Sequence, residues 1–118
     1  MKILVIDDES LVRLSLKRVF ESKGDKVFLA EDGQLGLEIW KTEKPDLVFL
    51  DVIMPKLTGP EVLTEIGKNK TGKVILISAY AGEQNQETAK QMGADLFLEK
   101  PFENIFDVVE KAKKLVCE

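Results

Sequence analysis

The fold is decided by the stretch Leu47-Val48-Phe49-Leu50-Asp51, in which four apolar residues run directly into a carboxylate. A second stretch has the same form, because Ile3-Leu4-Val5-Ile6 is followed by Asp7 and Asp8. Continuous apolar runs of this kind are typical of parallel strands that are covered on both faces. The carboxyl ends of such strands lie side by side, so we expect the three acids to meet in one crevice above the sheet.

Short β-rich runs alternate with segments of helical period along the chain, which predicts an α/β fold with a five-stranded parallel sheet and five helices. Strands are expected at residues 2–6, 26–30, 47–50, 74–78 and 96–99. Helices are expected at residues 11–22, 33–43, 59–68, 82–92 and 104–116. The helix at 82–92 has only Ala89 and Met92 as apolar anchors. It is therefore either a very polar surface helix or an element that shifts at low energetic cost.

Composition narrows the class of protein. The 118 residues are 44% hydrophobic, which is enough for one core, so we expect a single domain over residues 1–118. Cys117 is the only cysteine, which excludes an intramolecular disulfide and favours a reducing compartment, and we expect the cytoplasm. Apolar runs of about four residues are far too short to cross a membrane. The formal net charge of -4 argues against direct binding to nucleic acid, and the absence of histidine excludes imidazole catalysis.

Three carboxylates in one crevice repel one another unless a cation lies among them. Mg²⁺ prefers hard oxygen ligands and is the simplest cofactor to expect, with Asp8 and Asp51 as direct ligands. A metal-bound carboxylate can also act as a nucleophile toward phosphorus, and the product would be an aspartyl phosphate. A lone acid at the place of Asp51 would be read as a loop cap, but the pair Asp7 and Asp8 favours the metal site.

Two other predicted strand ends carry residue types that complement a phosphoryl group. Ser78 supplies a hydroxyl donor, and Lys100 supplies a compact ammonium. Taken singly, Ser78 is an ordinary loop hydroxyl and Lys100 is a solvated surface charge. Their joint placement on one rim favours a phosphoryl site. Pro101 allows a cis peptide bond after Lys100, and the sequence leaves the isomer open.

Four motifs occur in order, each at a predicted strand end: Asp7-Asp8, Asp51-Val52-Ile53-Met54-Pro55, Ser78-Ala79 and Lys100-Pro101-Phe102. Over essentially the whole chain, this pattern resembles the receiver domains of bacterial two-component response regulators. The resemblance implies a flavodoxin-like doubly wound fold with strand order 2-1-3-4-5. It also implies that Asp51 accepts the phosphoryl group and that Asp8 and the backbone carbonyl of Ile53 bind Mg²⁺ directly. Asp7 would reach the ion through water, and Lys100 and Ser78 would contact the phosphate.

The resemblance also implies partners and a switch. In the family, a sensor histidine kinase or a histidine phosphotransfer protein donates the phosphoryl group, and a chain without histidine agrees with the acceptor role. Phe97 matches an aromatic that rotates inward as the hydroxyl residue moves toward the phosphate; without the resemblance it is read as a core aromatic. The output face would comprise the helix at 82–92, the strand of Phe97 and the last helix, and it would control a downstream protein.

Residues in the loops next to these motifs lead to two further predictions. Thr58-Gly59-Pro60 replaces the commonest Asp-Gly dipeptide, and we expect Thr58 to cap the following helix as aspartate would. Ile53 and Tyr80 flank the expected path of a hydrolytic water, so their apolar bulk predicts slow loss of the phosphoryl group.

Two other functions are weighed against the switch. One is a Mg²⁺-dependent phosphohydrolase with Asp51 as nucleophile, which is disfavoured because Ile53 stands where a second acid would act. The other is an interaction module that keeps the fold and is never phosphorylated. The chain ends soon after the fifth predicted helix, so we expect either a stand-alone receiver that acts by protein contact or a receiver from a longer regulator. The sequence leaves the kinase, the target and the oligomeric state open.

Overall fold

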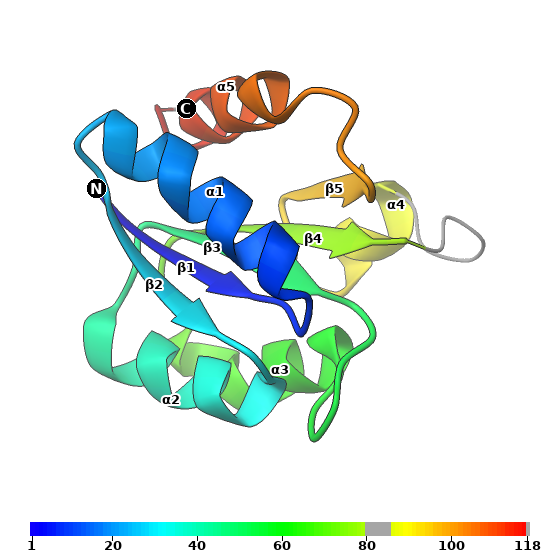
Figure 1. The fold of residues 1–118 in the computed structure, drawn as a ribbon. Coiled ribbons are helices and arrows are strands. Elements are labelled where there is room, and N and C mark those ends of the chain that lie inside the picture. The colour runs from blue at the N-terminus through cyan, green and yellow to red at the C-terminus, as the bar shows by residue number, and fades with distance from the viewer. Residues whose placement is uncertain (80–85, 118) are drawn as a thin grey trace.

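The computed structural model describes residues 1–79 and 86–117, which form a five-stranded parallel sheet between two layers of helices (Figure 1). The strands are β1 (Lys2–Ile6), β2 (Lys26–Ala30), β3 (Leu47–Asp51), β4 (Lys73–Ser78) and β5 (Leu96–Glu99). Their order is β2-β1-β3-β4-β5, which confirms the predicted flavodoxin-like arrangement. The direction of winding reverses between β1 and β3, and doubly wound sheets bind their ligands at the carboxyl ends of the strands at this point.

The helices are α1 (Ser10–Ser22), α2 (Gly33–Glu43), α3 (Gly59–Ile66), α4 (Gln86–Gln91) and α5 (Ile105–Cys117), and a short 3-10 helix, Gly67–Asn69, follows α3. α1 and α5 cover one face of the sheet, and α2, α3 and α4 cover the other (Figure 1). The predicted helix at 59–68 is wrong at its end, because Gly67 adopts a φ of 44° that no α-helix continues through.

Two hydrophobic cores, one on each face, explain why the strands are apolar throughout. Side chains alternate along a strand, so Val48 and Leu50 of β3 enter the core beneath α2, α3 and α4, whereas Leu47 and Phe49 enter the core beneath α1 and α5. All five residues of β3 are buried, including Asp51. Burial on both faces fixes the register of this central strand, because a slip of one residue would exchange its two sets of side chains.

The loop between β3 and α3 is held close to the strand that carries Asp51. Thr58 caps α3 as predicted: its Oγ1 accepts a hydrogen bond from the Glu61 N–H at 3.3 Å, and Glu61 Oε1 accepts one from the Thr58 N–H at 3.0 Å. The Gly59 N–H donates to the Val52 carbonyl at 2.9 Å. A Cβ at Gly59 would lie 2.6 Å from the Asp51 carbonyl oxygen, so only glycine fits there without a backbone shift.

α4 has few apolar contacts, as the sequence predicted. Ala89 is its only buried residue, and Met92, just after the helix, packs partly buried against the same core. The predicted start of this helix at Gly82 and the predicted role of Tyr80 lie outside the described residues. Among the helices of the described ranges, none is both long enough and apolar enough to cross a membrane.

Candidate functional site

The structure brings the three predicted acids together at the carboxyl edge of the sheet. Asp51 ends β3, and Asp7 and Asp8 follow β1, which pairs in parallel with β3. One carboxylate oxygen from each residue lies within 4.8 Å of the other two. Asp7 is 0% exposed and Asp51 is 4% exposed, whereas Asp8 faces solvent. Two strand ends therefore place two buried charges next to each other.

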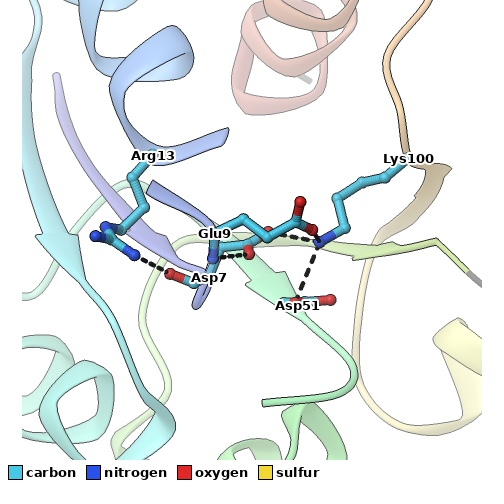
Figure 2. Close-up of polar contacts among 5 residues, drawn as sticks. All are labelled: Asp7, Glu9, Arg13, Asp51 and Lys100. Carbon is cyan, nitrogen blue, oxygen red and sulfur yellow. Dashed lines mark hydrogen bonds and ion pairs between the residues drawn. The ribbon is translucent and has the colours of Figure 1, made fainter. Parts of the chain in front are cut away.

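Lys100 supplies the positive charge of this cluster. It follows β5, and its side chain extends toward the ends of β1 and β3 (Figure 2). Its Nζ donates to Asp7 Oδ2 at 2.9 Å, to Glu9 Oε1 at 2.7 Å and to Asp51 Oδ2 at 3.2 Å. The ammonium is thus shared by three carboxylates, two of which are buried.

The remaining predicted site residues lie at or near the same edge. Ser78 ends β4 and is buried, and its carbonyl oxygen accepts a hydrogen bond from the Lys100 N–H at 2.8 Å. The peptide bond between Lys100 and Pro101 is cis, which resolves the isomer that the sequence left open. Ile53 is 57% exposed on the loop after Asp51.

Phe97 does not lie among the acids. It is half-buried on β5 and packs against the core beneath α2, α3 and α4. Its N–H donates to Gln86 Oε1 at 2.8 Å, which ties the middle of β5 to the first residue of α4. A movement of the β5 backbone at Phe97 would therefore be transmitted directly to the first residue of α4.

Burial and mutual repulsion make the acids of the cluster hard to ionise. Burial, followed by the charge of Asp7, raises the pKa of Asp51 to about 7, although Lys100 lowers it. Burial also raises the pKa of Asp7, against the hydrogen bonds from the Glu9 N–H and from Lys100. Burial alone would lower the pKa of the Lys100 ammonium, but its hydrogen bonds to Glu9 and Asp7 outweigh burial and raise it. The single ammonium of Lys100 therefore does not offset the cost of ionising both buried carboxylates.

Sequence reasoning missed two residues of this network. Glu9 binds Lys100 directly, and Arg13 Nη1 donates to the Asp7 carbonyl oxygen at 2.8 Å (Figure 2). A signal was present for each. Glu9 continues the run of acids that begins at Asp7, and Arg13 lies one helical turn after it.

The donor set fits a hard divalent cation. Asp7, Asp8 and Asp51 offer carboxylate oxygens close enough to share one ion, and oxygen is the ligand atom that Mg²⁺ prefers. Three carboxylates, those of Asp7, Glu9 and Asp51, share the single ammonium of Lys100, and Asp8 lies beside two of them. The cluster therefore keeps an excess of negative charge that a cation would offset.

Curated relatives match most of this chain. It is 41% identical over 101 residues to the "Probable transcriptional regulator ycf27" of Porphyridium aerugineum, and 38% identical over 102 residues to the "Alkaline phosphatase synthesis transcriptional regulatory protein PhoP" of Bacillus subtilis. Each match covers 86% of this chain but only 42% of the relative. The chain therefore spans less than half the length of these two transcriptional regulators.

Solved structures match almost the whole chain. The receiver domain of the Francisella response regulator 1452 has a TM-score of 0.88 at 31% identity, with 98% of this chain and 96% of that chain covered. A CheY-like receiver domain protein from Methanospirillum hungatei has a TM-score of 0.89 at 30% identity, with 98% and 93% covered. The family model described as "Response regulator receiver domain" matches residues 3–112. The chain accordingly belongs to the receiver domains of two-component response regulators.

Proposed function

We propose that this protein is a phosphorylation-dependent switch in which Asp51 accepts a phosphoryl group from a sensor histidine kinase or a histidine phosphotransfer protein. One observation carries the proposal: a nearly buried carboxylate ends the central strand, beside Asp7 and Asp8 and 3.2 Å from the ammonium of Lys100. Membership of the receiver family supports the same assignment. We take residues 1–118 as one such domain.

The transfer is a displacement at phosphorus. A carboxylate oxygen of Asp51 forms a bond to the phosphorus as the bond between phosphorus and the donor's imidazole nitrogen breaks. The imidazole nitrogen keeps the electron pair of that bond and takes up a proton. Bound Mg²⁺ would neutralise negative charge on the transferred oxygens, and we assign Asp8, Asp51 and the carbonyl oxygen of Ile53 as its direct ligands, with Asp7 as an outer ligand.

After transfer, residues at the neighbouring strand ends respond to the added charge at Asp51. The phosphoryl group adds a charge of roughly -1.5 to -2. The side chains of Lys100 and Ser78 can move toward its oxygens and donate hydrogen bonds to them. In our proposal Phe97 repacks with this movement. The bond between the Phe97 N–H and Gln86, and the few apolar anchors of α4, support a response of the face formed by α4, β5 and α5. That face would control a downstream protein, with no direct contact to nucleic acid from this stretch of chain.

The donor protein would dock beside α1 and α5. Large apolar side chains of Leu11, Leu14 and Phe106 are exposed there, and they line a groove that continues to Lys100 and Pro101. The phosphorylated imidazole of the donor must approach Asp51 from solvent next to Lys100, so that the Asp51 carboxylate can attack its phosphorus. A donor that covers this groove would bury apolar surface and bring its histidine to the cluster at the same time.

The experiment is intact mass spectrometry after incubation with acetyl phosphate and Mg²⁺. Wild type should gain one phosphoryl group, and both Asp51→Asn and a chelated sample should gain none. We propose no catalysis beyond this phosphotransfer and the chain's own dephosphorylation. The alternative function, a Mg²⁺-dependent phosphohydrolase, makes a different prediction. It would release phosphate from external phosphomonoesters with turnover that depends on Asp51, and no stoichiometric adduct would accumulate.

A further inference from the structure

Glu9 occupies the position at which a side chain usually caps a helix, and it does not cap. It is the residue just before α1, with the extended backbone of an N-cap, and its side chain accepts no hydrogen bond from the first turn. A side-chain acceptor at this position ordinarily stabilises the start of a helix. The carboxylate instead reaches across the crevice to Lys100, 91 residues away in the chain. The Glu9 side chain therefore makes a long-range ion pair and takes no part in the start of α1.

The three contacts of the Lys100 ammonium use all the hydrogens that it has. A lysine ammonium has three N–H donors, and here they have three acceptors, Asp7, Glu9 and Asp51. The contact with Glu9 is the shortest, at 2.7 Å. A new acceptor can therefore bind Lys100 only by displacing one of these carboxylates or by sharing a donor with it.

The three carboxylates differ in how easily they can give up the ammonium. The side chain of Asp7 is 0% exposed and that of Asp51 is 5% exposed, whereas that of Glu9 is 57% exposed. A buried carboxylate that loses its partner keeps the full cost of desolvation, but an exposed one is rehydrated by water. Glu9 is thus the partner that is released at the lowest cost.

The backbone around Glu9 is fixed by its neighbours. Its N–H donates to Asp7 Oδ1 at 2.9 Å, and its carbonyl oxygen accepts from the Arg13 N–H at 3.2 Å. Arg13 also binds the Asp7 carbonyl oxygen on the side away from Lys100 (Figure 2). The turn between β1 and α1 therefore aims the Glu9 side chain at the ammonium without any help from the helix cap.

We propose that Glu9 is a positioning residue that holds Lys100 while Asp51 is unphosphorylated and competes with the phosphoryl oxygens for the same ammonium. The inference rests on the proposed function of Asp51. A phosphoryl group on Asp51 adds anionic oxygens within reach of Lys100, and they repel the Glu9 carboxylate that binds the same ammonium. Glu9 releases Lys100 to the phosphoryl group and turns to solvent. Its carboxylate thereby sets how readily the switch enters the phosphorylated state.

The test compares Glu9→Gln and Glu9→Ala with a matched control, Glu31→Gln. Glu31 is an exposed glutamate that follows β2 at the same end of the sheet, and it is not among the three acceptors of Lys100. The probe is beryllofluoride, an analogue of the phosphoryl group, titrated at saturating Mg²⁺ at low and at high ionic strength. Loss of one partly exposed ionic contact should tighten beryllofluoride binding about three- to tenfold in both Glu9 variants. Glu31→Gln removes the same charge from a distance, so any smaller effect there should vanish at high salt.

A second readout needs neither Mg²⁺ nor phosphate. In the phosphate-free wild type, the two hydrogens on Cε of Lys100 should give separate NMR signals because the ammonium is held in one place. In both Glu9 variants these signals should merge or move toward each other, and in Glu31→Gln they should stay as in the wild type. A structural role of Glu9 confined to the start of α1 would not change them.

The outcomes separate the two claims. If the wild type takes up beryllofluoride but both Glu9 variants bind it equally well or more weakly, Glu9 does not compete for Lys100 and this inference is overturned while the proposed function stands. If the wild type takes up neither beryllofluoride nor a phosphoryl group from acetyl phosphate, the proposed function is overturned and the inference falls with it. Tighter binding in both Glu9 variants, together with altered Lys100 signals, supports the competition.

Discussion

Replacing Asp51 with asparagine should stabilise the metal-free protein, and the gain should grow with pH. The reason is the environment of the Asp51 carboxyl, which burial and the charge of Asp7 make difficult to ionise. Asparagine keeps the size of the side chain and removes the charge. Its amide oxygen can still accept a hydrogen bond from Lys100, which also keeps Asp7 and Glu9 as acceptors. Exchange of a charged acceptor for a neutral one should cost only about 1 kcal/mol.

The size and sign follow from the pKa of Asp51, which rises from 3.8 to about 7 on folding. Between these values the unfolded chain has lost the proton that the folded chain still holds, so ionisation of Asp51 destabilises the fold progressively as pH rises toward 7. A shift of about 3 units at about 1.4 kcal/mol per unit gives an upper limit of about 4 kcal/mol. The asparagine variant should therefore be close to wild type or slightly less stable near pH 4.5, and more stable by about 2–3 kcal/mol near pH 8.

The assay is urea unfolding in the presence of a chelator, followed by the fluorescence of Trp40, which is the only tryptophan and is fully buried. Asp107→Asn is the matched control, because Asp107 is an exposed aspartate in the first turn of α5. The difference in unfolding free energy between Asp51→Asn and wild type should rise with pH, and that for Asp107→Asn should stay nearly constant. A difference for Asp51→Asn that is equally flat would refute the argument that Asp51 is strained by burial and repulsion.

Three further predictions concern the loop, the donor surface and the lifetime of the phosphoryl group. Gly59→Ala should lower the unfolding free energy by about 1–3 kcal/mol, because its Cβ would meet the Asp51 carbonyl oxygen; unchanged urea unfolding would contradict this. Leu14→Ser should slow phosphotransfer from a donor protein about tenfold more than phosphorylation by acetyl phosphate, and equal slowing in the two assays would argue against the groove beside Phe106. Ile53→Asn should speed dephosphorylation by admitting water next to the site, and an unchanged half-life of the adduct would remove Ile53 from that role.

The sequence predicted the central site because strand ends are easy to recognise in a parallel sheet. An apolar run that is buried on both faces must stop where the first charge appears, so Asp7 and Asp51 marked the ends of β1 and β3. Because β1 and β3 are adjacent parallel strands, their carboxyl ends place the two acids side by side. Lys100 was also predicted directly after β5, although that strand already includes the charged Glu99.

Other features depend on small energy differences that a sequence pattern does not report. The contact between Glu9 and Lys100 depends on the rotamer of one exposed side chain and on the turn that Arg13 and Asp7 hold in place. α3 ends at Ile66 because of the backbone angle at Gly67, and the pattern of apolar residues does not contain that angle. Helix ends are for this reason harder to predict than strand ends that terminate in a charge.

The central claim is that Asp51 is the residue that becomes phosphorylated. The most direct measurement is to treat the protein with acetyl phosphate and Mg²⁺, reduce the acyl phosphate with borohydride, and map the product by tandem mass spectrometry. Because hydride reduces an aspartyl phosphate to homoserine, the account predicts homoserine at position 51 and at no other aspartate, and none when Mg²⁺ is chelated. Homoserine at Asp7 or Asp8 instead, or a phosphorylated protein with an intact Asp51, would contradict it.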